Sequence, residues 1–258
     1  MEILKVENLS TGYGDFIALK SVNFIIDEGE FVGIIGPNAS GKTTLLRTIA
    51  KILPVRSGNI YLLEKNITEY NYREYSKKVA FATNVSDYAL NYNVYDFLML
   101  GRYPWNFEVD GKEFKEIYEN FELERIFRKK LNELSSGELQ RVIVAQALIQ
   151  SSCLLLLDEP VSHLDIAHQI HILDVLKKIN QEKKLTILAS FHELNLACEY
   201  CDKIILISNG EVRKIGTPHE VIDYRIIEEV YNTQVIVKVN PISKKPYVIP
   251  VPMMWKDN

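Results

Sequence analysis

An apolar run followed by a glycine-containing loop limits the possible folds of this chain more than any other feature. Residues 31–35 (FVGII) are apolar throughout, as expected of a strand that is covered on both faces. The next eight residues, 36–43 (GPNASGKT), match the pattern G-x-x-x-x-G-K-S/T in full, and a helical pattern follows them. A strand, such a loop and a helix together cradle phosphate groups, because backbone N–H groups converge at the helix N-terminus. The sequence therefore predicts a nucleotide-binding α/β fold.

The polar residues of this phosphate loop have distinct predicted roles. Lys42 would supply a positive charge to the β- and γ-phosphates, and the Thr43 hydroxyl would ligate Mg²⁺. The glycines would let the backbone approach the phosphates closely. The predicted nucleotide-binding residues of the loop are Gly36, Pro37, Asn38, Ala39, Ser40, Gly41, Lys42, Thr43 and Thr44.

Two carboxylates follow a second apolar run. Asp158 and Glu159 come directly after four leucines at 154–157. The carboxyl end of a buried parallel strand is where α/β sheets bind ligands. We expect Asp158 to help hold Mg²⁺ against the phosphates. Glu159 is the candidate to orient or deprotonate an attacking water.

Apolar strands alternate with helical patterns through the rest of the core. A third apolar run lies at 186–189, and between it and the leucines the apolar residues from 166 to 179 recur at helical spacing. Asp165 precedes them as a candidate N-cap. Such alternation indicates a parallel sheet with right-handed crossovers. Residues 204–215 add a β-hairpin with a type I′ turn at Asn209-Gly210, which makes the predicted sheet a mixed one.

The middle and the end of the chain have different patterns. Residues 86–149 contain helical patterns and no strand pattern, which predicts an α-helical subdomain inserted into the core. Its last and longest pattern predicts an apolar helix over 138–150. We therefore predict a single domain over 1–240, with the α/β core in 1–85 and 150–240. Residues 241–258 contain four prolines and should form an extended, mostly irregular tail.

Composition excludes several functional classes. The 258 residues include 30 Lys and Arg against 34 Asp and Glu, so no bulk positive charge favours nucleic-acid binding. No stretch approaches the roughly 20 apolar residues of a membrane helix. Three cysteines make a disulfide framework improbable and indicate a reducing, cytosolic setting. Cys198 and Cys201 form C-x-x-C, which we interpret as two thiols of a helical turn rather than a redox or metal pair. The spacing of His163, His168 and His171 does not match a zinc site.

Several further motifs resemble one family. Residues 134–141 (LSSGELQR) resemble the signature motif of ATP-binding cassette (ABC) proteins, and 162–165 (SHLD) resemble their D-loop, which ends at Asp165. His192 resembles the switch histidine, and Tyr13 resembles the aromatic residue that stacks on adenine. The resemblance covers about residues 1–240. It implies the ABC ATPase fold, with ATP and Mg²⁺ as ligands.

The resemblance also implies a mechanism. Two copies would form a head-to-tail homodimer with two ATP molecules between them. Each ATP would contact the phosphate loop of one chain and the signature residues of the other. Glu159 would polarise the attacking water, and His192 would hydrogen-bond the γ-phosphate. The implied signature contacts are Ser135, Ser136, Gly137 and Glu138.

Two positions depart from the family pattern. Ser136 replaces the usual glycine, a change that we expect to be tolerated because Ser135 and Gly137 are kept. Asn84 stands where the family has a glutamine that contacts Mg²⁺. Its side chain is one methylene shorter, so Asn84 would reach the metal through a water or not at all.

Three segments resemble those of metal-chelate importers, which carry iron–siderophore complexes, haem or cobalamin. The segments are 101–104 (GRYP), 162–169 (SHLDIAHQ) and 192–197 (HELNLA). Implied partners are a membrane permease in two copies and, indirectly, an extracytoplasmic substrate-binding protein, with this chain at the cytoplasmic face of the membrane. Molybdate or tungstate importers remain an alternative. A soluble cassette protein of DNA repair, Fe–S assembly or translation and a nonhydrolysing interaction protein are further alternatives.

Overall fold

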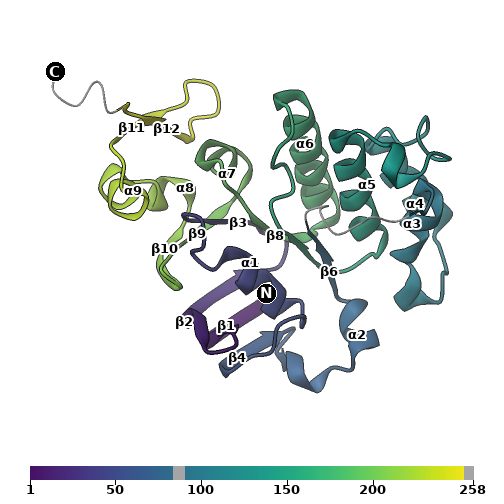
Figure 1. Cartoon of the computed structure of the whole chain (residues 1–258), viewed down its shortest axis with the longest axis horizontal. Helices are drawn as coiled ribbons and strands as arrows, with labels where there is room; N and C mark the ends of the chain where they lie inside the picture. The colour runs from purple at the N-terminus through teal and green to yellow at the C-terminus, as the bar shows by residue number, and fades with distance from the viewer. Residues whose placement is uncertain (84–90, 253–258) are drawn as a thin grey trace.

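A six-stranded sheet forms the centre of the molecule, with the strand order β10-β9-β3-β8-β7-β6 (Figure 1). The computed structural model describes residues 1–83 and 91–252. Five of the strands are parallel, and β10 is antiparallel to β9 at the edge. The mixed α/β sheet predicted from the sequence is therefore confirmed. The strands are β3 (Phe31–Ile35), β6 (Val79–Ala82), β7 (Leu154–Leu157), β8 (Thr186–Ser190), β9 (Lys203–Ser208) and β10 (Glu211–Gly216).

Both faces of this sheet are covered, which explains why its central strands are apolar throughout. Phe31 and Ile35 belong to a core shared with helices α5 (Ser136–Ile149) and α6 (Ile166–Lys183). Val32 and Ile34 belong to a second core, which includes residues of α1 (Lys42–Ile49). Successive side chains of a strand point to opposite faces, so a strand between two cores has no polar face.

An antiparallel sheet adds to the second core. Its strand order is β2-β1-β4-β5, and apolar residues of β1, β2 and β4 lie in the same core as α1. The alternation of buried and exposed residues in β2 is typical of a sheet with one solvated face. The strands are β1 (Glu2–Tyr13), β2 (Phe16–Asp27), β4 (Ser57–Leu62) and β5 (Lys65–Asn66), followed by η1 (Ile67–Glu69) and α2 (Tyr72–Ser76).

The helical insertion lies at one end of the molecule, and the C-terminal hairpin lies at the other (Figure 1). Within residues 91–149 the structure places only helices as named elements, as the sequence pattern predicts. Helix α5 begins at Ser136, two residues earlier than the apolar pattern indicated. The division into one domain over 1–240 stays a prediction. The elements of the insertion before α5 are α3 (Val94–Leu100), η3 (Tyr103–Trp105), α4 (Gly111–Asn120) and η4 (Leu131–Glu133).

The hairpin turn between β9 and β10 confirms its predicted type and supports the phosphate loop. Asn209 and Gly210 have φ values of 54° and 80°, as a type I′ turn requires. The Gly210 N–H donates to the carbonyl oxygen of Ser40 at 3.1 Å. The turn therefore holds one end of the loop against the sheet.

The tail, predicted to be extended and mostly irregular, contains one strand that the sequence pattern did not indicate. Strand β12 (Pro246–Pro250) pairs with β11 (Val235–Val239) as a two-stranded sheet. The two prolines stand at the ends of β12, where a missing N–H is tolerated, and the buried Val248 lies between them. Helices α7 (Leu194–Tyr200), α8 (Pro218–Val221) and α9 (Tyr224–Tyr231) complete the described structure.

Candidate active site

The phosphate loop joins the buried strand β3 to helix α1, and its glycines are required by its shape. A Cβ atom on Gly36 would lie 2.0 Å from the carbonyl oxygen of Ile207. Gly41 has a φ of 110°, and its Cβ would lie 2.5 Å from a methyl group of Leu19. Side chains at either position would displace the loop. Because α1 starts at Lys42, its free N–H groups face the loop and favour an anion there.

Lys42 reaches back across the loop. Its ammonium donates to the carbonyl oxygens of Gly36 at 2.8 Å and Pro37 at 3.0 Å. Burial lowers the pKa of Lys42, while Glu159 and Asp158 raise it. The Ser40 hydroxyl is buried and makes no hydrogen bond to any described residue. A partially desolvated cation and an unpaired donor in one loop fit the phosphates of a nucleotide.

Asp158 and Thr43 are brought together as predicted for a metal shell. The Thr43 hydroxyl donates to the Asp158 carboxylate at 3.0 Å, and the Ser190 hydroxyl donates to the same oxygen at 2.8 Å. Burial raises the pKa of Asp158, and the two hydroxyl bonds lower it. A carboxylate beside a hydroxyl suits Mg²⁺, and no group of three or more His, Cys, Asp or Glu ligands exists among the described residues. Mg²⁺ takes few protein ligands and keeps phosphate and water oxygens.

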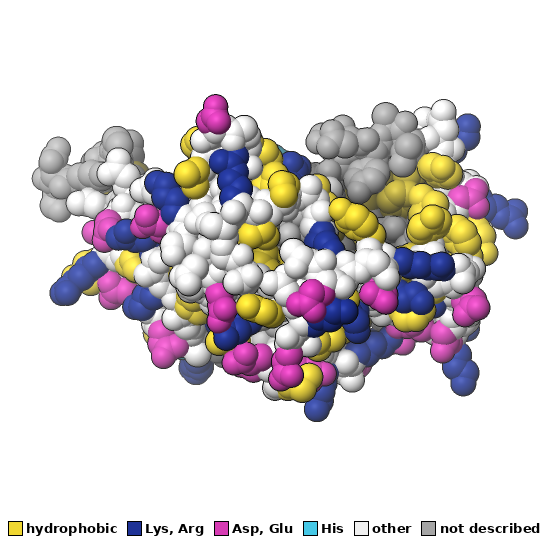
Figure 2. All heavy atoms as spheres, turned by 90° about the horizontal axis from the view of Figure 1, so that it is seen from below, with side chains coloured by type: hydrophobic (Ala, Val, Ile, Leu, Met, Phe, Trp, Pro, Cys, Tyr) yellow, Lys and Arg dark blue, Asp and Glu magenta, His cyan; other side chains and the backbone are white. Residues whose placement is uncertain are grey.

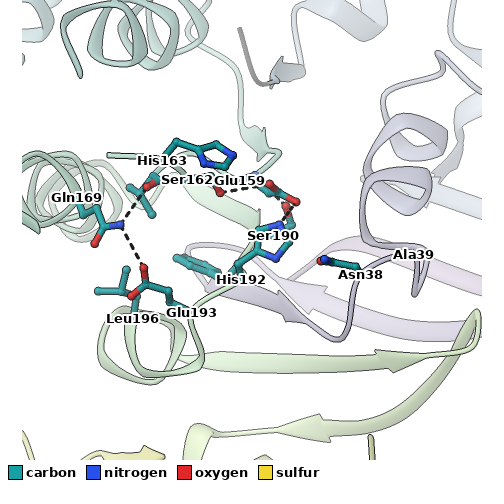
Figure 3. A pocket seen from close by; sticks show the side chains of 12 residues that line it. Asn38, Ala39, Glu159, Ser162, His163, Gln169, Ser190, His192, Glu193 and Leu196 are labelled. Atoms are coloured by element: carbon teal, nitrogen blue, oxygen red, sulfur yellow. Dashed lines mark hydrogen bonds and ion pairs between the residues drawn. The ribbon is translucent and has the colours of Figure 1, made fainter. Parts of the chain in front are cut away.

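Glu159 and His192 are in contact and line a cavity of about 600 Å³ (Figure 3). The Glu159 carboxylate lies 2.5 Å from Nε2 of His192 and accepts from the Ser162 hydroxyl at 3.2 Å. The Glu159 N–H donates to Ser190 at 2.9 Å, which fixes the backbone at a φ of 53°. Asn38 of the phosphate loop lines the same cavity. The arrangement places a candidate general base beside the phosphate-binding loop.

A second cavity of about 270 Å³ lies along the phosphate loop and shares Glu159 and His192 with the first. Tyr13 lines it, as expected of a residue that stacks on adenine, and its side chain is 45% exposed. Phe16 lines it too and is 67% exposed. Exposed aromatic rings beside a phosphate loop can stack on a base. Sequence reasoning missed Phe16, although an aromatic residue three positions after Tyr13 was a signal for it.

The signature residues form the N-terminus of α5. Ser135 caps the helix: its hydroxyl accepts from the Glu138 N–H at 3.2 Å, and its own N–H donates to the Glu138 carboxylate at 2.8 Å. The bond from the Ser135 N–H lowers the pKa of Glu138. None of the four residues from Ser135 to Glu138 lines either cavity beside the phosphate loop. Within one chain, the structure does not bring the signature to the nucleotide site.

Gly137 and the D-loop are in contact through His168. A Cβ on Gly137 would lie 2.8 Å from the His168 ring, so the glycine is required by this packing. Nδ1 of His168 lies 2.8 Å from both carboxylate oxygens of Asp165. Asp165 also accepts from the His168 N–H at 3.0 Å, which confirms its predicted role as the N-cap of α6.

The other histidines and the cysteines were not predicted to bind a metal. His163 lines the larger cavity, and no metal-binding group of three ligands includes any of these residues. Cys198 and Cys201 are free and buried, and burial raises the pKa of the Cys198 thiol to about 12. Thiols that stay protonated at neutral pH are poor nucleophiles and metal ligands, in agreement with the interpretation of C-x-x-C as helical packing. Asn84 lies outside the described residues.

Three further cavity residues were not singled out from the sequence. Ser190, at the end of β8, joins Asp158 to the backbone of Glu159. Gln169 and Glu193 are hydrogen-bonded to each other at 3.3 Å. Gln169 and Glu193 lie in the segments 162–169 and 192–197 that resemble metal-chelate importers, but no local pattern predicts a contact between such distant parts of the chain.

Comparison with known proteins places these features in a family. Residues 19–162 match the ABC transporter family. The ferric enterobactin transport ATP-binding protein FepC of Escherichia coli is 31% identical over 255 residues, which cover 96% of this chain and 94% of FepC. The iron(3+)-hydroxamate import ATP-binding protein FhuC of Bacillus subtilis is 32% identical over 252 residues, with coverage of 95% and 94%. The uncharacterized ABC transporter ATP-binding protein YvrA of Bacillus subtilis is 36% identical over 253 residues, and this chain spans 57% of its length.

Solved structures have the same fold. A structure described as a metal-chelate type ABC transporter in an inward-facing conformation has a TM-score of 0.82 at 21% identity, covering 98% of this chain and 99% of the other. A dimeric bacterial ABC transporter cassette has a TM-score of 0.72 at 31% identity, with coverage of 83% and 98%. No helix in the described chain is long and apolar enough to cross a membrane. The phosphate loop, the acidic pair and these similarities together show that the chain belongs to the ABC transporter family and is an ATP-binding subunit that hydrolyses ATP.

Proposed function

We propose that this chain powers the import of a metal chelate of the iron–siderophore class, by closing as a head-to-tail homodimer on two ATP molecules. The observation that carries the proposal is the separation within one chain of two half-sites. Residues of the phosphate loop line one region together with Glu159 and His192, and Asp158 is hydrogen-bonded to Thr43 of that loop. The signature at Ser135 lies outside this region. A second chain would supply the missing half.

In this proposal each residue of the site has a separate role in ATP binding or hydrolysis. Lys42 and the N–H groups of α1 bind the phosphates. Thr43 and Asp158 would hold Mg²⁺, which when bound neutralises charge on the phosphates. Glu159 accepts the proton of the attacking water, and His192, paired with Glu159, donates to the γ-phosphate. Tyr13 stacks on the adenine.

The signature would act on the nucleotide of the partner chain. The N-terminus of α5 carries a partial positive charge, and Ser135 offers a hydroxyl there. Gly137 is buried against the His168 ring, and this contact links the signature to Asp165 of the D-loop. Two-state closure of the dimer on ATP would then drive the membrane subunits between orientations.

The exposed aromatic end of the helical insertion is the proposed permease contact. Hydrophobic side chains gather at the end of the molecule that carries α3 and α4 (Figure 2). Tyr95 packs edge-on against Phe114 yet remains exposed, as do Tyr103 and Phe107. Apolar clusters of this kind mark protein interfaces. In the homodimer, two such surfaces would bind two permease copies at the cytoplasmic face. An extracytoplasmic binding protein would deliver the cargo to the permease.

Relatives named for ferric enterobactin and iron(3+)-hydroxamate support the choice of cargo. The test is transport. The chain is reconstituted in liposomes with its permease and binding protein, and ATP-dependent uptake is measured for a ⁵⁵Fe-labelled siderophore, cobalamin and molybdate. Uptake of the iron complex that is lost in the Glu159→Gln variant is the expected result. Uptake of molybdate alone would contradict the assignment of the cargo.

A further inference from the structure

One buried amide joins the two chain segments that hold the catalytic pair. Gln169 lies in the first turn of α6, and its side chain is 8% exposed. Its Nε2 donates to the carbonyl oxygen of Val161 at 3.2 Å and to the carboxylate of Glu193 at 3.3 Å. In Figure 3 the Gln169 amide lies at the far side of the cavity from the phosphate loop, with one bond to each segment.

The two acceptors stand next to the catalytic residues in sequence. Val161 is two residues after Glu159, in the segment that follows β7. Glu193 directly follows His192, in the segment that follows β8. The contact between Glu159 and His192 is 2.5 Å long, so it depends on the separation of these two segments. The Gln169 bridge between Val161 and Glu193 therefore fixes the separation of the two segments, on the side of the cavity away from the phosphate loop.

The bridge requires the chemistry of an amide. Both N–H groups of the Gln169 amide are used, one on a neutral carbonyl and one on a charged carboxylate. A carboxylate at this position would face two acceptors and would repel Glu193. A leucine would fill the space without a donor and leave the Val161 carbonyl unpaired in buried surroundings.

We infer that Gln169 is a positioning residue for ATP hydrolysis, which holds the His192 segment against the Glu159 segment so that both side chains meet the γ-phosphate and the water. The inference rests on the proposed roles of Glu159 and His192. It concerns the rate of the chemical step and not the affinity for ATP, because Gln169 lies outside the cavity that contains Tyr13 and Lys42.

The chain offers a matched control for a purely structural role. Asn180 lies on the same helix, is 3% exposed and donates from its amide to the carbonyl oxygens of Gly29 and Leu185, each at 2.8 Å. It too joins distant segments through two hydrogen bonds, yet it lines neither cavity of the site. Asn180→Leu should therefore lower the thermal midpoint and leave kcat within about twofold of the parent, as a remote packing change does.

Steady-state ATPase kinetics of the full chain test the inference. Gln169→Leu should lower kcat about tenfold, the scale of a lost hydrogen bond to a charged group, with KM for ATP within about threefold of the parent. Gln169→Glu should lower kcat further. The double variant Gln169→Glu with Glu193→Gln restores the hydrogen bond between positions 169 and 193. Its kcat should be at least about threefold higher than that of Gln169→Glu alone.

A variant at the exposed Glu193 tests the same hydrogen bond if the Gln169 variants do not fold. Glu193→Ala removes the exposed acceptor and should lower kcat about three- to tenfold at unchanged KM. Unchanged kcat in Glu193→Ala, or a kcat loss in Asn180→Leu equal to that in Gln169→Leu, would overturn the inference. The Glu159→Gln variant separates failure of this inference from failure of the proposed catalytic roles. If those roles are wrong, Glu159→Gln would hydrolyse ATP at the rate of the parent chain.

Discussion

At the scale of a single residue, Asp158 is needed for the proposed function, but its buried carboxylate lowers the stability of the fold. The carboxyl is 6% exposed, and burial raises its pKa in the folded chain above its ordinary value. The folded chain therefore binds this proton more tightly than the unfolded chain does. The resulting cost to stability is absent below the unfolded pKa, develops as the pH rises through the folded pKa, and is complete above it. A bound cation would offset that cost.

We predict that Asp158→Asn raises the thermal midpoint at pH 7.5 without Mg²⁺ and lowers ATPase activity by roughly 100-fold or more. The asparagine can still accept from Thr43 and Ser190, and it carries no buried charge. The matched control is Asp110→Asn. Asp110 is an exposed N-cap whose pKa is lowered by backbone N–H groups, and asparagine caps a helix equally well. A lower midpoint for Asp158→Asn would contradict the account.

Lys42 supplies the fixed positive charge of the phosphate loop. Lys42→Ala should weaken ATP binding by roughly 100-fold, because the phosphates lose a charge-assisted partner that is already partly desolvated. Isothermal titration with ATP and Mg²⁺ measures this directly. Lys20→Ala is the control, since Lys20 is exposed and its backbone N–H, which the substitution keeps, donates to Gly210 of the same hairpin turn. Equal affinities for the two variants would remove Lys42 from the assigned role.

At the scale of elements, the C-terminal hairpin is fastened to the helix that follows the switch histidine. The Asn195 amide of α7 donates to the Val248 carbonyl at 3.1 Å, and its oxygen accepts from the Val248 N–H at 2.8 Å. A side chain thus pairs with β12 as a neighbouring strand would. Ser243 donates to Glu199 of the same helix at 2.8 Å, which gives the hairpin a second attachment.

Asn195→Ala should lower the free energy of unfolding by about 1–2 kcal/mol, since both backbone groups of Val248 lose their partner. Urea denaturation measures the change. Asn195→Asp retains the acceptor and loses the donor, so its effect should be intermediate. Identical stabilities for all three chains would show that the hairpin is held by its apolar contacts alone.

Elements with a local cause could be predicted from the sequence, and contacts between distant segments could not. The β3–loop–α1 unit and the Asn209-Gly210 turn follow from short patterns. The start of α5 was placed two residues late because its capping box, Ser135 with Glu138, was not used. Strand β12 was missed because two prolines delimit it. Ser190 meets Asp158 over 32 residues and Gln169 meets Glu193 over 24, and only the sheet and α6 bring them together.

At the scale of the whole molecule, the account depends on two chains. The signature at the N-terminus of α5 and the cavities beside the phosphate loop do not share a residue. Hydrolysis in the proposed mechanism therefore requires that ATP draw two chains together, and that Glu159 then act on the water. A variant that binds ATP without hydrolysing it should accumulate in the closed state.

The most direct test is size-exclusion chromatography with light scattering on Glu159→Gln, in parallel with its ATPase assay. The variant should lose hydrolysis by roughly 10²–10⁴-fold, the usual scale for a general base, and should run as a dimer with ATP and Mg²⁺ and as a monomer without them. Addition of Lys42→Ala to the same chain should abolish the ATP-dependent dimer. A Glu159→Gln chain that stays monomeric with ATP and hydrolyses it at the parent rate would contradict the account.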